Sequence, residues 1–194
     1  MRTTFHGANE VSACQLPAQS YSTAFPVALG DISSLGNLRF SSNLCGHILA
    51  VKCGNGPVVN VIVMNSNLGG GLDLYASSWN RATNNASPGV QSCSVQMTSQ
   101  NIFTFDGYVC YHATGETNNQ YYRNVGLLNV KDKIVVSATY NGIAGRLQSN
   151  APYFEFNGQG NGNTPVIFRF SDGSTHSVPL NQCKSGGDPK KMWN

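Results

Sequence analysis

The sequence predicts an all-β protein with two domains. Only 11% of its 194 residues are charged, and its 21 glycines are joined by abundant asparagine and serine, a composition that favours turn-rich β structure over helices. Short strand-like runs separated by turn signals recur along the chain, and their close spacing in the second half is typical of a β-sandwich. Four of the six cysteines precede residue 100 and two follow it, as expected for two separately cross-linked domains.

In the first half, we expect strands at 48–53 and 58–64, and the apolar character of the second indicates burial on both faces. A triple glycine at 69–71 interrupts the chain. The only helix we expect covers 74–82, and the turn-forming residues 84–89 end it. We place the first domain at 1–99, the second at 100–185 and a polar tail at 186–194.

The second half reads as strands joined by turns. A strand at 133–140 leads into Asn141-Gly142, a strong hairpin signal, and a strand at 165–171 leads into Asp172-Gly173 and a return strand at 177–180. A short aromatic strand covers 153–156. The glycine-rich segment 158–162 lacks the lysine and the following helix of a nucleotide-binding loop, so we interpret it as a hairpin turn.

Charge and cysteine usage exclude several classes of function. The net charge of +3 is spread along the chain, which argues against a nucleic-acid partner, although it could favour acidic wall polymers. No apolar run approaches the roughly 18 residues of a membrane span. We expect no cofactor and no metal, because the chain has no Cys-x-x-Cys and its histidines lack ligand spacing. The cysteines therefore predict disulfides and an oxidising compartment, and we interpret Met1 as the start of a mature secreted chain whose leader was removed.

Short sequence elements follow one another in the first half in the same order as in the proteins of one known fold. This half resembles the double-psi β-barrel of expansins, barwin-like proteins and family-45 glycoside hydrolases. The elements are Thr3-Thr4-Phe5-His6-Gly7, Ala13-Cys14, Asn43-Leu44-Cys45-Gly46, Val51-Lys52-Cys53, Val61-Ile62-Val63-Met64-Asn65, Gly71-Leu72-Asp73-Leu74 and Trp79-Asn80-Arg81.

The second half carries three more elements: Tyr121-Tyr122, the segment 153–156 and the hairpin 168–173. These resemble the carbohydrate-binding β-sandwich of expansins, so that the likeness covers nearly the whole chain. It implies a six-stranded double-psi β-barrel followed by an immunoglobulin-like β-sandwich. It also implies the disulfides Cys14–Cys45, Cys53–Cys93 and Cys110–Cys183, although spacing alone permits other pairings.

The resemblance implies a groove that binds glycan through Thr4, Asn65 and Asp73. Glycoside hydrolysis normally takes two carboxyl groups, one as acid and one as base or nucleophile. Asp73 stands where the hydrolase relatives carry their acid, but Gly7 matches the position of their second aspartate, and Asn65 replaces an aspartate that expansins usually carry. Because an amide cannot act as a general base, we expect no enzymatic cleavage. The remaining acids nearby, Glu10 and Asp31, fall in predicted loops.

Two of these features also have a structural alternative. Asp73 directly precedes the expected helix, where an aspartate often serves as an N-cap. The triple glycine at 69–71 could let backbone approach a ligand closely, or it could simply give a flexible loop.

The resemblance also implies a flat aromatic platform formed by Tyr121, Tyr122 and Tyr153, whose rings suit stacking on sugar faces. Adjacent strand residues point to opposite faces, so Tyr121 and Tyr122 can both face a ligand only if the backbone bends there. We assign Phe154 and Phe156 to the core.

The function that these features predict is a secreted expansin-like protein that binds cell-wall polysaccharide and loosens it without hydrolysis. The alternatives are a family-45-type hydrolase or lytic enzyme, and a protein-binding double-psi barrel such as a protease inhibitor or elicitor. The sequence does not choose among cellulose, xylan, chitin and peptidoglycan, and we expect a monomer. Asn85 lies in a glycosylation sequon whose use the sequence leaves open.

Overall fold

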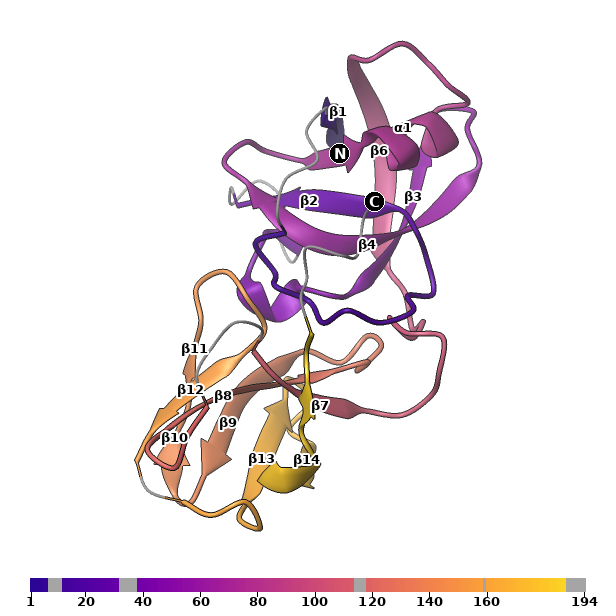
Figure 1. The fold of residues 1–194 in the computed structure, drawn as a ribbon. Helices are drawn as coiled ribbons and strands as arrows, with labels where there is room; N and C mark the ends of the chain where they lie inside the picture. The colour runs from indigo at the N-terminus through magenta and orange to yellow at the C-terminus, as the bar shows by residue number, and fades with distance from the viewer. Residues whose placement is uncertain (7–11, 32–37, 114–117, 159, 188–194) are drawn as a thin grey trace.

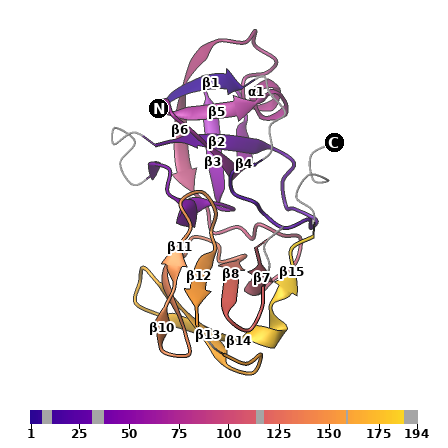
Figure 2. The ribbon, with the colours of Figure 1, turned by 60° about the vertical axis from the view of Figure 1, so that its left-hand side comes forward.

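The computed structural model describes residues 1–6, 12–31, 38–113, 118–158 and 160–187. It confirms an all-β chain whose first half is a closed barrel of six strands. Two further sheets follow below the barrel in the views of Figures 1 and 2. Within the described ranges, no helix has the length and apolar character needed to cross a bilayer.

The barrel closes through both parallel and antiparallel pairs. Going round it, the strands are β1 (Arg2–His6), β5 (Leu72–Tyr75), β2 (Pro26–Gly30), β4 (Val58–Asn67), β3 (Ile48–Cys53) and β6 (Val90–Met97). The pairs β1–β5 and β2–β4 are parallel, and the other four are antiparallel. A short 3-10 helix, η2 (Ser42–Leu44), precedes β3. Inward-facing residues such as Val51, Val61 and Leu74 form the barrel core.

The expected helix starts two residues later than its apolar spacing predicted. Helix α1 covers Ala76–Ala82, because Leu74 is paired in β5 with Phe5 of β1 and Val27 of β2. Strand pairing on both sides therefore overrides the helical pattern at this point. Trp79 of α1 is fully buried, and its ring meets Phe5 edge to face at 6.0 Å between centroids, which fastens the helix to the barrel.

The triple glycine serves the packing of strands. Gly71 has φ +95°, and a Cβ there would lie 1.8 Å from the carbonyl oxygen of Arg2. A Cβ on Gly30 would lie 2.4 Å from the carbonyl oxygen of Gly69. Neither distance is possible between real atoms, so glycine at these positions lets the 69–71 segment lie directly against β1 and β2.

The second half consists of two antiparallel-rich sheets. One has the order β11 (Arg146–Leu147), β12 (Phe154–Asn157), β8 (Tyr122–Leu128), β7 (Val109–His112) and β15 (Lys184–Ser185). The other has the order β10 (Ile143–Ala144), β9 (Val135–Tyr140), β13 (Pro165–Phe170) and β14 (Thr175–Pro179), followed by the 3-10 helix η3 (Leu180–Gln182). Rings from both sheets meet between them, with Phe154 and Phe168 6.4 Å apart and Tyr140 and Phe156 5.8 Å apart. Phe154 and Phe156 are buried core residues, as predicted.

Two turn predictions had opposite outcomes. Asn141 and Gly142 both have positive φ, 50° and 75°, as a two-residue hairpin turn requires, and they join β9 to β10. The hairpin is therefore confirmed. The segment 158–162 connects β12 to β13, which lie in different sheets, so its interpretation as a hairpin turn was wrong.

All three disulfides pair as the resemblance implied. Cys14–Cys45 and Cys53–Cys93 lie in the barrel half, and Cys110–Cys183 lies in the second half. The first two close loops within the barrel, and the third ties β7 to the segment that precedes β15. Each half is thus cross-linked within itself.

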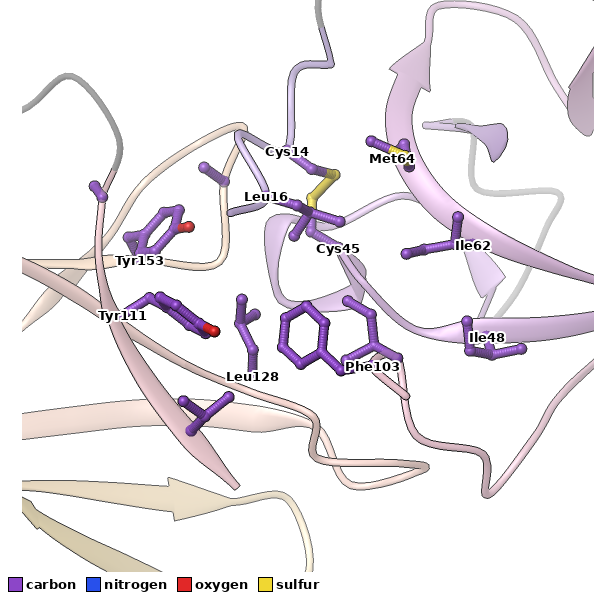
Figure 3. Packing of buried hydrophobic residues seen from close by; sticks show 14 residues of the cluster. Cys14, Leu16, Cys45, Ile48, Ile62, Met64, Phe103, Tyr111, Leu128 and Tyr153 are labelled. Carbon is purple, nitrogen blue, oxygen red and sulfur yellow. A yellow bond between two sulfur atoms is a disulfide. The ribbon is translucent and has the colours of Figure 1, made fainter. Parts of the chain in front are cut away.

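A third cluster of buried residues, here called the junction core, joins the two halves. Figure 3 shows its side chains meeting between the barrel and the sheets. Tyr153 Oη also donates to the carbonyl of Gln15 at 2.9 Å, and the amide of Ala18 donates to Gly186 at 2.8 Å. The barrel contributes Cys14, Leu16, Cys45, Ile48, Ile62 and Met64, and the second half contributes Ile102, Phe103, Val109, Tyr111, Ala113, Leu128, Ala151 and Tyr153.

His47 makes a further polar link across this junction. Its Nδ1 lies 3.1 Å from the carbonyl oxygen of Leu44 in the barrel, and its Nε2 lies 3.1 Å from the carbonyl oxygen of Lys133 in the second half. Burial of the ring lowers the pKa of His47. A neutral ring carries one N–H, and with that proton on Nε2 His47 donates to Lys133 across the junction, which adds a polar contact to the apolar packing between the two halves.

The junction core predicts that the two halves unfold together. Phe103 is 1% exposed and contacts the rings of Tyr21, Phe105 and Tyr111. We expect Phe103→Ala to lower the free energy of unfolding by about 3–5 kcal/mol, in a single transition, in urea titrations followed by circular dichroism. The control Phe105→Ala, whose ring is 38% exposed, should lose less. Separate transitions, with only one of them shifted by Phe103→Ala, would contradict a shared core.

Candidate functional site

Strand register brings Asp73 beside Thr4 on the outside of the barrel. Thr4 of β1 pairs with Asp73 of β5, Asp73 pairs with Ala28 of β2, and Ala28 pairs with Asn65 of β4, which gives one row across four strands. Side chains alternate along a strand, and the neighbours Leu72 and Leu74 point into the barrel core. Thr4 and Asp73 therefore face away from that core.

Asp73 is held by its neighbours and only partly reaches solvent. The Thr4 hydroxyl donates to Asp73 Oδ1, and His6 Nδ1 lies 3.9 Å from Asp73 Oδ2. The Asp73 side chain is 22% exposed. Burial raises the pKa of Asp73, and electrostatic interactions with His6 and Arg2 offset part of that rise. The carboxyl group thus binds a proton more readily than a free aspartate, and part of its side chain is exposed.

The alternative role of Asp73 as a helix cap was wrong. Asp73 lies within β5, and Tyr75 occupies the N-cap position of α1 without a side-chain capping bond. The oxygen that a cap would turn towards backbone amides accepts instead from Thr4. The helix does not explain this carboxylate.

Asn65 is bound within the protein. It is 7% exposed, its Oδ1 accepts from the amides of Ala13 at 3.3 Å and Ser66 at 3.0 Å, and its Nδ2 donates to Tyr75 Oη at 3.2 Å. A register shift beside Val27 and Ala28 places Asn65, rather than the preceding residue, opposite Ala28. These bonds direct the Asn65 amide at groups of the protein itself, including the Tyr75 hydroxyl, and direct binding of glycan by Asn65 stays a prediction.

Two residues of this site were missed by the sequence reasoning. His6 follows Thr4 by two residues and Tyr75 follows Asp73 by two, so both point to the same side as the Thr4–Asp73 pair. The two also pair with each other in the sheet, with ring centroids 4.6 Å apart. Strand alternation could have revealed them, but the assignment of 74–82 to a helix hid Tyr75. We call Thr4, His6, Asp73 and Tyr75 the Asp73 face.

Tyr121 and Tyr122 lie at a bend of the backbone. Such a bend is what two adjacent residues need if both are to face the same ligand. The amide of Asn119 donates to Tyr122 at 2.8 Å, and Asn119 Oδ1 accepts from the amides of Tyr121 and Tyr122 at 2.8 and 3.1 Å. Tyr121 is 56% exposed just before β8. Tyr122 is half-buried and starts β8, where alternation places it on the opposite side from the inter-sheet residue Val125.

Tyr153 does not belong to an aromatic platform, and its prediction was wrong. The side chain is fully buried in the junction core, where its hydroxyl donates to Gln15. Figure 3 shows its ring near Cys14 and Leu16 of the barrel half. Burial accordingly raises the pKa of the Tyr153 hydroxyl. The sheet face that carries Tyr153 is covered there by the barrel, so no sugar can reach the ring.

The described residues give little support to a metal site or to an enclosed pocket for a sugar. The part of the chain with assigned positions holds no cluster of three or more His, Cys, Asp or Glu side chains suited to a metal. A cavity of about 20 Å³ lies at the junction, lined by His47, Leu128 and Pro152 among others. It has room for about one water molecule and is too small for a sugar ring.

By sequence, no family model and no curated protein matches the chain. By structure, it is similar to an expansin of Clavibacter michiganensis. One crystal structure, an asparagine-for-aspartate variant in complex with cellohexaose, superposes with a TM-score of 0.65 at 16% identity, covering 92% of this chain and 88% of that one. The apo form of that expansin gives a TM-score of 0.63 at 16% identity with the same coverage.

The chain has an expansin-like fold with a double-psi barrel. Because the superposition covers 92% of the chain, the likeness includes both the barrel and the paired sheets. At 16% identity this likeness establishes the fold alone and says nothing of the chemistry of the Asp73 face.

The raised pKa of Asp73 predicts that its charge costs stability. The neutral form is favoured by the fold, so its stabilising contribution is fully present below the unfolded pKa of about 3.9 and is lost as the pH rises through the folded pKa. We expect Asp73→Asn to raise the melting temperature at pH 7 and to change it little at pH 3, measured by calorimetry.

Asp172→Asn is the opposite control. Hydrogen bonds from Ser174 and Lys133 lower the pKa of Asp172 to about 2, so its charge stabilises the fold at pH 7 and this variant should melt at a lower temperature. If Asp73→Asn also melts lower than wild type at pH 7, the charge of Asp73 contributes to stability and the account of its environment is wrong.

Proposed function

We propose that this chain is a secreted expansin-like protein that binds cell-wall polysaccharide and loosens it without cutting it. The observation that carries the proposal is the Asp73 face, where one carboxylate lies beside a hydroxyl and two rings on the outside of the barrel. The expansin of similar fold was crystallised with cellohexaose, which supports a glucan as ligand.

The binding surface that we propose combines polar and aromatic contacts. Thr4 and Asp73 offer hydrogen-bonding groups that sugar hydroxyls can match, and the exposed ring of Tyr121 offers an apolar plate. Tyr122 adds a second, half-buried ring at the same bend. Because the junction core fixes the barrel to the sheets, both parts of this surface keep a constant relation to each other.

The supply of carboxylates supports a non-hydrolytic action. Among the described residues of the barrel, the only carboxylate besides Asp73 is Asp31, which follows the end of β2; Gly7 and Glu10 lie outside the described residues. Its backbone is tied to Asn67 and Arg39 there. Cleavage needs a second carboxyl group across the scissile bond, and Asn65 supplies an amide at the nearest position of the row. With the glycosidic bond intact, hydrogen bonds to the protein would compete with those between chains and let the chains slip.

Domain organisation and location complete the proposal. We divide the chain into a barrel domain at 1–99 and an immunoglobulin-like, carbohydrate-binding β-sandwich at 100–185; β6 ends at Met97 and β7 begins at Val109. Three disulfides support an oxidising, extracellular setting. We propose that the protein acts as a monomer and that cellulose is its first target, with xylan, chitin and peptidoglycan as the alternatives to test.

Binding to insoluble polymers tests the proposal. We expect the wild-type chain to sediment with cellulose, and Tyr121→Ala to weaken this binding by about threefold or more because an aromatic stacking surface is lost. Ile167→Ala is the matched control, since Ile167 is 43% exposed but lies on β13 of the other sheet. Xylan, chitin and peptidoglycan are assayed in parallel to identify the polymer.

The same supernatants test for cleavage. We expect no reducing ends from wild type, together with faster extension of cellulose paper under constant load. Reducing ends that disappear in Asp73→Asn but persist in Asp31→Asn would make the protein a hydrolase. Absence of binding to all four polymers would favour a protein-binding barrel.

A further inference from the structure

The Asp73 face carries a pair of rings whose arrangement is fixed from several strands. His6 and Tyr75 are neighbours across the β1–β5 pair, with ring centroids 4.6 Å apart and planes at 54°. Each is partly exposed, and the His6 side chain reaches 19%. His6 lies 3.9 Å from the carboxylate of Asp73, so the rings border the one acidic group of this face.

Asn65 determines where the phenol of Tyr75 lies. Asn65 belongs to β4 and Tyr75 to β5, and β2 runs between these two strands in the barrel. The 3.2 Å bond from Asn65 Nδ2 to Tyr75 Oη therefore draws the Tyr75 side chain across β2. Ala28, the β2 residue between Asp73 and Asn65 in the row, faces outward yet is only 1% exposed, as expected beneath a covering side chain.

Asn65 can hold this position because its own amide is immobilised. Its Oδ1 accepts from the backbone amides of Ala13 and Ser66, which leaves Nδ2 directed at Tyr75. Loss of rotational freedom in a ring is a cost of ligand binding that such pre-organisation reduces. The bond to Asn65 thus holds the Tyr75 ring in place before any ligand binds, as a pre-organised binding surface requires.

We propose that Tyr75 and His6 form a sugar-stacking subsite beside Asp73, and that Asn65 is the positioning residue that holds Tyr75 for it. This inference rests on the proposed polysaccharide-binding function and assigns that function a subsite within the barrel. A pyranose ring would lay its C–H face on the Tyr75 ring while its hydroxyls bond to Asp73 and Thr4.

The occupant that fits this surface is a neutral, β-linked chain of glucose configuration. A ring whose hydroxyls are all equatorial presents flat C–H faces to an aromatic plate, whereas the axial hydroxyl of mannose interrupts one of them. When it is ionised, the Asp73 carboxylate repels the acidic group of a uronic acid, so we expect a pectin-like chain to be disfavoured at this subsite even though the net charge of +3 could attract it to the protein as a whole. The subsite should therefore favour cellohexaose over mannohexaose.

Calorimetric titration with these two soluble hexasaccharides tests the subsite. Tyr75→Ala should weaken cellohexaose binding by about three- to tenfold and should reduce the preference for cellohexaose over mannohexaose. Tyr75→Phe keeps the ring without its anchor and should give an intermediate loss. His6→Ala, which removes the partner ring at a partly exposed position, is a second variant that guards against misfolding of the Tyr75 variants, and melting temperatures verify that each is folded.

The positioning role of Asn65 has its own readout. Asn65→Ala removes the anchor and should weaken cellohexaose binding about as much as Tyr75→Phe. Asn65→Asp should restore most of the affinity, because a carboxylate can accept from the Tyr75 hydroxyl and still accept from the amides of Ala13 and Ser66. Equal loss in both Asn65 variants would overturn the positioning role.

Failure of the subsite is distinguishable from failure of the proposed function. If wild type binds cellulose and Tyr121→Ala weakens that binding, while Tyr75→Ala and His6→Ala leave cellohexaose affinity and selectivity unchanged, the subsite is wrong and the proposed function stands. If wild type binds neither cellohexaose nor any of the four insoluble polymers, both are wrong; if it binds xylan, chitin or peptidoglycan but not cellohexaose, the subsite is wrong and the proposed function stands. Weaker binding in the ring variants with a reduced glucose-over-mannose preference supports the subsite.

Discussion

The parallel pairing of β1 with β5 brings the first strand of the chain against a segment 69 residues away, in a register that sets the Thr4 hydroxyl against the Asp73 carboxylate. Gly71 makes this approach possible, since any side chain there would collide with the backbone of Arg2. The same register pairs His6 with Tyr75. A shift of one residue would turn Asp73 towards the barrel core and separate all four groups, so the chemistry of the Asp73 face depends on this single pairing.

The junction core holds the second half of the chain in a fixed position relative to the Asp73 face. Aromatic side chains from the second half, above all Phe103, Tyr111 and Tyr153, pack on the barrel around the Cys14–Cys45 disulfide. Because these rings are buried, they cannot contact a sugar. Their packing instead holds the two halves in one arrangement. If a glycan contacts both halves, as we propose, this rigidity lowers the conformational freedom that is lost on binding.

Much of the fold could be predicted because local signals and long-range pairing agree. The strands 48–53 and 165–171, the Asn141-Gly142 hairpin and the even distribution of cysteines all correspond to features of the structure. The helix boundary failed where they disagree. Leu74 begins the apolar series that continues through Ala76, Trp79 and Ala82, but it is paired with a strand on each side, and β5 cannot be recognised from its own four residues.

The site was predicted less completely, for reasons that lie beyond local sequence. Asp73 and Thr4 were identified by resemblance, and their contact follows from the register. The burial of Tyr153 depends on where the segment around Leu16 crosses the sheet, which no pattern in 153–156 records. The internal role of Asn65 depends on a register shift between β2 and β4, and such an irregularity has no signature in an apolar strand.

We propose, as the central point of this account, that one intact glycan chain contacts the Asp73 face and the Tyr121–Tyr122 bend together. The most direct test is a titration of isotope-labelled protein with cellohexaose or a longer soluble β-glucan, followed by amide chemical shifts, with the length of the glycan checked afterwards. The account predicts shifts at Thr4, Asp73 and Tyr75 and at Tyr121 and Tyr122 with a common dissociation constant, and a glycan of unchanged length. Shifts confined to residues outside both surfaces, or a shortened glycan, would contradict it.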